Sequence, residues 1–302
     1  MIRREFIKSA VLAAGALSLA PTEVLAKAKK NEKKIDVPLR KSIMWETVRM
    51  KDCSVLERFK AIKAAGFDGV EPSSHMDREE VKGALAQSGL LASSVCNSKH
   101  WSLLMSSADP KVRKEGIEAQ IQAMEDAVAY GTDAVLLVPG KVTEETGYSD
   151  CWKRSTECIR ELIPAARAMK VLICIENVWN NFILSPIEAR EYVDQFDSEW
   201  VKFYFDCGNV LKYGWPEQWI ETLGGRVGRI HIKEFSKTLE DTLGRHKGFG
   251  VKLGEGEVNW PAVMGQIRAN YCGGWLTTEQ GTSTNLEELI DLRRRLDAIM
   301  DK

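Results

Sequence analysis

Four polar residues that can bind a metal ion stand at or directly after the ends of short apolar segments: Glu176, Asp206, His231 and Glu279. A buried carboxylate costs several kcal/mol unless it is paired or bound to a ligand. Three carboxylates and one imidazole form a hard, oxygen-rich donor set, which suits Mn²⁺, Mg²⁺ or Co²⁺ and is also compatible with Zn²⁺. The sequence therefore predicts one divalent-metal site. The alternative is four polar strand ends that satisfy one another without a metal.

The segments that carry these residues predict strands of a parallel sheet. Residues 171–175, VLICI, form a continuous β-branched and apolar run of the kind that a strand buried on both faces requires. Side chains alternate between the two faces of a strand, and the parity of each candidate allows it to point to the inside of a closed sheet.

A short apolar run, a polar turn and an amphipathic helix recur eight times along the chain. The expected strands are 42–45, 69–72, 91–96, 132–138, 171–175, 201–205, 227–232 and 275–278, and the expected helices are 55–65, 78–87, 111–130, 150–169, 186–196, 216–223, 260–271 and 286–300. This alternation predicts an α/β fold, a (β/α)8 TIM barrel. An open, doubly wound sheet is the alternative, but no GxGxxG segment follows an early strand. Only closure of the sheet would gather the four metal-site candidates at one mouth.

The N-terminal residues 1–26 have the pattern of an export signal. Arg3 and Arg4 precede a short apolar run at 10–20, and Val24 and Ala26 offer a cleavage site with a small residue. The paired arginines are typical of a twin-arginine signal. The apolar run is too short to span a bilayer, which needs roughly 20 residues. We therefore expect an exported, periplasmic protein with a cleaved signal, a charged linker at 27–38 and a single barrel domain at 39–302. The alternative is a basic, amphipathic N-terminus that stays in the cytoplasm.

Composition argues against a protein that binds nucleic acid. The 302 residues carry a formal net charge of −1 and four histidines, so little in the sequence attracts a phosphate backbone. The seven cysteines are odd in number and lack CxxC spacing, which indicates mostly buried thiols and not a disulfide framework.

Several segments together are specific for one family of barrels. They are GFDGVEPS at 66–73, IENVWNNFILSP at 175–186, FDCGN at 205–209, HIKE at 231–234, LGEGEVNW at 253–260 and TTEQG at 277–281. With these segments the chain resembles the xylose isomerase-like sugar isomerases and epimerases, which share their fold with the AP endonuclease 2 superfamily. The resemblance covers nearly all of the predicted barrel.

The resemblance implies one divalent ion, commonly Mn²⁺, held by the matching residues Glu176, Asp206, His231 and Glu279. It implies a small carbohydrate as substrate. Glu176 and Glu279 would be the catalytic acid and base, one on each side of the substrate, and would move a proton next to a carbonyl through an enediolate. Family barrels often pair through their outer helices, so a homo-oligomer is also expected.

Five further residues are weaker candidates for substrate contacts: Glu71, His100, Trp179, Asn209 and Lys233. Glu71 could instead orient a metal ligand or pair with a neighbour such as Lys233, and Lys233 could merely pair with a carboxylate. Family epimerases that act on free ketoses usually carry histidine where this chain has Asn209, and often arginine where it has Lys237. These departures indicate a changed contact with the substrate. The glycine-rich loop at 244–256, which contains His246, is long enough to form a lid.

Three other functions remain open at this point. The same metal and base could cleave a 3-keto glycoside by β-elimination, which would make the protein a lyase. A DNA endonuclease of the same superfamily would need more metal ligands and a basic face. A non-catalytic sugar-binding protein would have lost one of the acid/base carboxylates, and both glutamates are present.

Overall fold

The computed structural model describes residues 37–302. The predicted export signal at 1–26 and nearly all of the predicted linker at 27–38 lie outside the described residues. Among residues 37–302, no helix is both long and apolar enough to cross a membrane.

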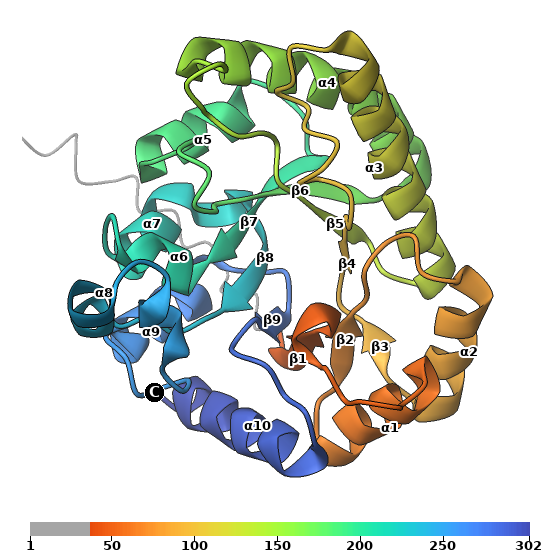
Figure 1. The fold of residues 1–302 in the computed structure, drawn as a ribbon, viewed down its shortest axis with the longest axis vertical. Coiled ribbons are helices and arrows are strands. Elements are labelled where there is room, and N and C mark those ends of the chain that lie inside the picture. The colour runs from red at the N-terminus through yellow and green to blue at the C-terminus, as the bar shows by residue number, and fades with distance from the viewer. Residues whose placement is uncertain (1–36) are drawn as a thin grey trace, which may run out of the picture. The chain divides into compact units, whose positions relative to one another are not determined.

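Within residues 37–302, nine strands form one parallel sheet in the order β3-β2-β1-β9-β8-β7-β6-β5-β4. They are β1 (Arg40–Met44), β2 (Gly69–Glu71), β3 (Leu91–Ala92), β4 (Val95–Cys96), β5 (Ala134–Leu137), β6 (Leu172–Glu176), β7 (Val201–Asp206), β8 (Val227–Ile232) and β9 (Trp275–Thr278). The helices surround this sheet, as Figure 1 shows. The predicted TIM barrel is therefore confirmed.

The expected strand at 91–96 is divided into β3 and β4, which corrects the prediction of one continuous strand. The two halves occupy opposite ends of the sheet order, and Ser93 and Ser94 lie between them. An isolated parallel bridge between Ser73 and Cys96 joins the edges beyond β2 and β4. At the interruption the Ser93 carbonyl accepts from the Arg229 side chain at 2.8 Å and not from the backbone of a strand. The two serine hydroxyls make contacts inside the barrel, where Ser93 bonds Ser42 at 2.7 Å and Ser94 bonds Glu71 at 2.6 Å.

Eight of the helices correspond to those expected from the sequence, with ends that differ by a few residues. They are α1 (Val55–Ala65), α2 (Arg78–Ser88), α3 (Pro110–Tyr130), α4 (Tyr148–Met169), α5 (Pro186–Asp194), α7 (Pro216–Leu223), α9 (Trp260–Asn270) and α10 (Leu286–Met300). Local signals set their ends: Ser54 and Glu57 form a capping box at the start of α1, and Gly66, at φ 97°, ends it in the left-handed conformation.

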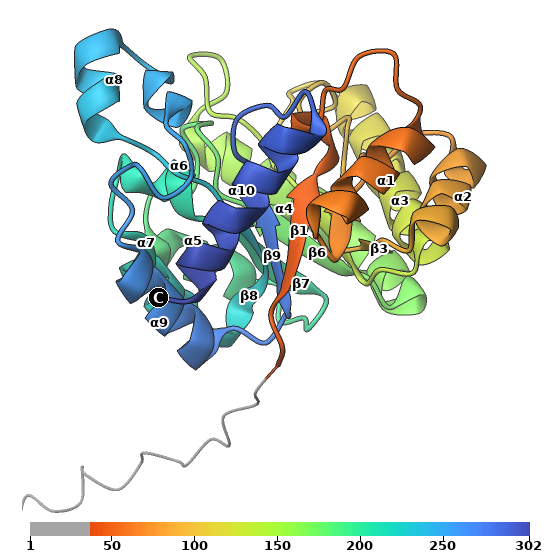
Figure 2. The same cartoon turned by 90° about the horizontal axis from the view of Figure 1, so that it is seen from below.

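Two short helices, α6 (Cys207–Leu211) and α8 (Lys237–Leu243), were not expected. Every residue of α6 is buried and none of α8 is, so neither shows the one-sided apolar pattern that marks a helix in a sequence. Figure 2 shows α8 projecting beyond the other helices, on the side toward which the strands run.

Candidate metal centre and active site

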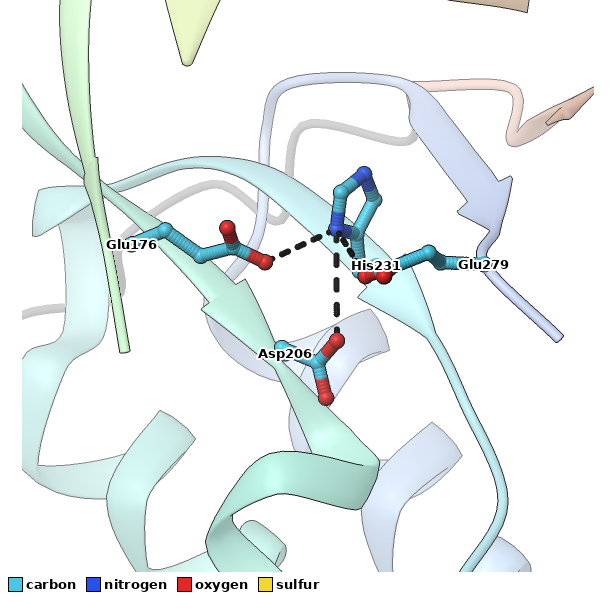
Figure 3. Close-up of side chains that lie close together, drawn as sticks. All are labelled: Glu176, Asp206, His231 and Glu279. Atoms are coloured by element: carbon cyan, nitrogen blue, oxygen red, sulfur yellow. Dashed lines mark hydrogen bonds and ion pairs between the residues drawn. The ribbon is translucent and has the colours of Figure 1, made fainter. Parts of the chain in front are cut away.

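The structure brings together the four residues that the sequence singled out. Glu176 ends β6, Asp206 ends β7, His231 lies in β8 and Glu279 follows β9. One potential ligand atom from each lies within 4.8 Å of all the others. His231 Nδ1 is 2.9 Å from Glu176 Oε1, 3.1 Å from Glu279 Oε2 and 3.9 Å from Asp206 Oδ2. In Figure 3 the two glutamates extend toward this nitrogen from opposite sides, and Asp206 approaches from a third direction.

Strand register explains why these side chains meet. Asp206 and His231 are direct partners in the β7–β8 ladder. His231 is also the partner of Thr277 in β9, so Glu279, two residues further along, has the same parity. Glu176 pairs with Tyr204, two residues before Asp206, and therefore shares its face. The alternation along each strand directs all four to the inside of the barrel mouth.

Asp206 presents one oxygen to the cluster and uses the other for the fold. Its Oδ1 accepts a hydrogen bond from the backbone N–H of Asn209 at 2.7 Å and so caps α6. Its Oδ2 is buried and has no hydrogen-bond partner among the described residues. An unpartnered buried carboxylate oxygen is costly, whereas a bound cation would satisfy it. This oxygen, together with the three-carboxylate and one-imidazole donor set, fits a divalent cation.

Burial and the neighbouring charges shift the pKa values of the clustered side chains. Burial raises the pKa of Glu176, and it raises the pKa of Asp206 to about 7. Burial also opposes a charged His231, but the carboxylates of Glu71, Glu176 and Glu279 outweigh it and hold the pKa of His231 well above its usual range. Burial would likewise raise the pKa of Glu279, yet the nearby Lys233 ammonium and His231 lower it strongly. A further positive charge, such as a bound cation, would therefore stabilise the ionised forms of these carboxylates.

Glu71 contacts His231 and is not among the residues that line the central cavity, which favours the alternative that it orients a metal ligand. The side chain is fully buried, with 0% of its surface exposed. Its Oε2 is 2.9 Å from His231 Nε2, and its Oε1 accepts hydrogen bonds from Ser94 Oγ at 2.6 Å and Tyr204 Oη at 2.8 Å. Glu71 therefore holds the far nitrogen of the imidazole and turns Nδ1 toward the cluster, as a carboxylate behind a metal-binding histidine does.

A cavity of about 390 Å³, called here the central cavity, opens beside the cluster. Glu176 and Glu279 line it, together with His100, Trp179, Asn209 and Lys233, which are the four remaining predicted substrate contacts. Phe249, Val178, Met44 and Cys96 also line it and were missed. Val178 has the parity of Glu176, which is a usable signal, whereas nothing in the sequence distinguishes Phe249 within the glycine-rich loop.

Three of the side chains that line the central cavity have defined partners or a shifted pKa. Lys233 Nζ lies 2.9 Å from Glu279 Oε1 and 3.7 Å from Asp206 Oδ2, so its partners are these carboxylates and not Glu71. Burial lowers the pKa of His100 to about 4, which leaves the imidazole neutral at neutral pH. Asn209 Nδ2 donates to the Asn177 carbonyl at 2.9 Å.

Two residues of the glycine-rich loop at 244–256, His246 and Phe249, line the central cavity next to Trp179. The Trp179 ring lies 4.9 Å from those of His246 and Phe249, and its Nε1 donates to the Asn209 carbonyl at 3.0 Å. Lys237, in contrast, starts α8 and lies over the Trp215 ring at 5.7 Å, outside the central cavity. Lys237, which stands where family epimerases often carry arginine, therefore places no positive charge in the central cavity.

Fold and site together define a parallel (β/α) barrel with a carboxylate-rich cluster, at the C-terminal ends of its strands, that could hold a metal ion. Residues 59–298 match the xylose isomerase-like TIM barrel family, and the chain belongs to it.

The proteins to which this chain is similar include sugar epimerases. L-ribulose-5-phosphate 3-epimerase UlaE of Escherichia coli O1:K1 / APEC is 25% identical over 236 residues, which cover 73% of this chain and 80% of the relative. The apo crystal structure of 3-keto-D-glucoside 4-epimerase, YcjR, from E. coli has a TM-score of 0.72 at 17% identity and covers 87% of this chain and 100% of that one. A xylose isomerase-like TIM barrel protein from Mycobacterium smegmatis, solved in complex with magnesium, has a TM-score of 0.66 at 18% identity and covers 89% and 98%. The solved structures share the fold, and the family and the curated relative support the prediction of a sugar isomerase or epimerase.

Proposed function

We propose that this protein is a divalent-metal-dependent sugar isomerase or epimerase that removes and returns a proton next to a carbonyl. The observation that carries the proposal is the placement of Glu176 and Glu279, which both line the central cavity and approach His231 Nδ1 from opposite sides (Figure 3). Two opposed carboxylates can act on both faces of one carbon, which is what inversion of a stereocentre requires.

The metal centre would consist of Glu176, Asp206, His231 and Glu279. We propose Mn²⁺ as the ion, with Mg²⁺, Co²⁺ and Zn²⁺ as alternatives, because the donor set is rich in carboxylate oxygen. When bound, such an ion polarises a carbonyl and makes the neighbouring C–H more acidic.

The side chains of the chain itself would carry the proton. One glutamate takes it from the carbon next to the carbonyl, which leaves an enediolate, and the other returns a proton from the opposite side. Lys233, 2.9 Å from Glu279, holds that carboxylate at the wall of the central cavity. Trp179 offers an aromatic face to the apolar side of a sugar ring, and neutral His100 and Asn209 offer hydrogen-bonding groups for its hydroxyls.

A lyase is the second candidate, and the departures at Asn209 and Lys237 favour keeping it. One of the opposed carboxylates would remove the proton next to the ketone of a 3-keto glycoside, and the electron pair would expel the glycosidic oxygen, which takes up a proton from the other, protonated carboxyl group. The products would be an unsaturated keto sugar and the free aglycone.

Incubation of the Mn²⁺-loaded protein in D₂O, followed by NMR, tests both candidates. Ketoses and 3-keto glycosides serve as substrates, and the Glu279→Gln variant serves as the control. Deuterium in an intact sugar supports the isomerase or epimerase and identifies the carbon, whereas release of an aglycone supports the lyase. Absence of exchange and of cleavage with every sugar contradicts the proposed function.

Export is a separate proposal that rests on the sequence of residues 1–26. We propose that the protein is delivered to the periplasm with the signal removed after Ala26. Cell fractionation and N-terminal sequencing test it, because retention of Met1 in a cytoplasmic fraction would contradict both parts. Size-exclusion chromatography of the same material tests the expected homo-oligomer.

A further inference from the structure

A second depression, called here the side cleft, adjoins the central cavity at the barrel mouth. It has a volume of about 520 Å³, and Phe249 lines both it and the central cavity. Its wall also contains Gln280, which follows Glu279 directly in the chain. Phe249 is thus the one residue that the linings of the two cavities share among the described residues, so the two cavities adjoin at this side chain.

The walls of the side cleft are held by hydrogen bonds. Gln280 Nε2 donates to the carbonyls of Phe249 at 3.2 Å and Val251 at 2.6 Å, and its Oε1 accepts from the Glu234 backbone N–H at 2.6 Å. Arg295 Nη1 donates to the Leu253 carbonyl at 3.2 Å. The fully buried Glu234 accepts from the backbone N–H of Gly254 at 3.0 Å. Because these bonds fix the backbone of both walls, a ligand would find a formed site and pay little ordering entropy.

The charges of the side cleft disfavour an anion. Its basic residues, Lys252 and Arg295, both pair with Asp291, at 3.3 Å and 2.9 Å. Glu287 and Glu288 add further negative charge to the lining, and Glu288 accepts the Thr284 backbone N–H at 2.6 Å near the start of α10. Among the described residues that line the side cleft, a phosphate group would meet carboxylates and only cations that are already paired.

The remaining lining suits a neutral, hydroxylated ring. Sugar rings present an apolar face and a polar edge, and bind where apolar side chains stand next to hydrogen-bonding groups. The side cleft offers both, from apolar Phe249, Val251, Leu253 and Leu292 and from polar Thr282 and Asn285.

We propose that the side cleft is a second subsite, which binds a neutral sugar ring or aglycone attached to the carbonyl-bearing sugar in the central cavity. The proposal rests on the proposed function, since it needs the reacting sugar in the central cavity. The substrate class is then a glycoside or disaccharide and not a sugar phosphate.

Pairs of probes that share the reacting unit test this subsite. Fructose is compared with lactulose, its 4-galactosyl derivative, and methyl 3-keto-β-D-glucoside with the phenyl 3-keto-β-D-glucoside; fructose 6-phosphate is the anionic probe. Affinity is measured by calorimetry on the Mn²⁺-loaded protein, and turnover by deuterium exchange. We expect the larger neutral member of each pair to bind about tenfold more tightly, the equivalent of roughly 1.4 kcal/mol. Thr282→Trp, which fills the side cleft, should remove this preference. The matched control is Thr242→Trp on α8, outside both cavities, which should keep the preference.

The two proposals fail in different ways. Equal affinity within each pair, an unchanged preference in Thr282→Trp, or tighter binding of fructose 6-phosphate than of lactulose would overturn the subsite. Absence of exchange with every probe would contradict the proposed function, while the binding comparison would still decide on the subsite.

Discussion

Replacement of Glu71 by glutamine is expected to weaken divalent-metal binding while the barrel stays folded. Glu71 touches no part of the central cavity, but it holds His231 Nε2 at 2.9 Å. The amide of glutamine has the shape of the carboxylate and can still accept from Nε2–H. It lacks the negative charge that makes the opposite nitrogen, Nδ1, a better ligand. Its NH₂ group must also face Ser94 and Tyr204, whose hydroxyls would have to turn and accept.

The size of the effect follows from this contact. Loss of a carboxylate behind a metal-binding histidine typically costs 10- to 100-fold in metal affinity, or about 1.4–2.7 kcal/mol. Because the hydrogen bonds can be remade, the free energy of unfolding of the metal-free protein should fall by no more than about 2 kcal/mol. Glu71→Ala should be worse on both counts, since it leaves three buried donors unpaired at about 1–3 kcal/mol each.

Titration of metal-free protein with Mn²⁺, followed by electron paramagnetic resonance of the free ion, measures the affinity directly. Urea unfolding of the metal-free forms measures stability. Glu46→Gln is the matched control, because Glu46 is an exposed carboxylate that also accepts a serine hydroxyl, from Ser73 at 2.6 Å. An affinity of Glu71→Gln equal to that of Glu46→Gln would refute the role of Glu71 as the residue that positions His231.

Further predictions concern the acid/base pair, a buried histidine, a buried thiol and the ion. Glu176→Gln and Glu279→Gln should each abolish deuterium exchange and change the free energy of unfolding by less than about 2 kcal/mol; wild-type exchange in either would contradict the mechanism. The pKa of His100 falls from 6.5 to about 4 on folding, so the unfolded chain binds its proton first and stability is lost as pH drops through this window. Relative to His100→Gln, the wild type should lose about 2 kcal/mol between pH 7 and about pH 5 in urea titrations, and parallel curves would show that His100 titrates normally. Cys174→Ala should retain nearly full exchange activity, because this thiol is fully buried and does not line the central cavity; a large loss would reveal a functional thiol. Removal of divalent ions with a chelator should lower the melting temperature and Mn²⁺ should restore it, whereas equal melting temperatures would argue against a bound ion.

The barrel and the meeting of the four metal-site candidates were predictable for the same reason. A strand buried on both faces must be apolar along its length, so a charged residue at its end is conspicuous. Parity then determines which way the residue points, as the direct pairing of Asp206 with His231 illustrates. Both signals depend only on neighbouring residues, so both can be recognised in a single sequence.

The residues that surround the cluster were harder to predict because their roles depend on distant partners. Glu71 and His231 are 160 positions apart, and no local pattern indicates that one holds the other. Ser93 and Ser94 interrupt the third strand through contacts with other strands, which a periodicity argument cannot register. Phe249 lies in a glycine-rich segment without a one-sided apolar face, so nothing in the sequence marks it as part of the wall of the central cavity.

Ser93 and Ser94, between β3 and β4, contribute both to contacts between strands of the barrel and to the support of the candidate metal centre. Ser93 Oγ accepts a hydrogen bond from Ser42 Oγ of β1 at 2.7 Å within the barrel, and Ser94 donates to Glu71, which contacts the imidazole of the candidate metal centre. A change at these serines would disturb barrel closure and ion binding together, so neither property can be adjusted alone. Thr282 in the side cleft differs, because it belongs neither to these serine contacts nor to the four metal-site candidates. New substrate preferences should therefore arise by substitution in the side cleft, while Ser93 and Ser94 stay fixed, and attempts to redesign the specificity of this barrel should begin there.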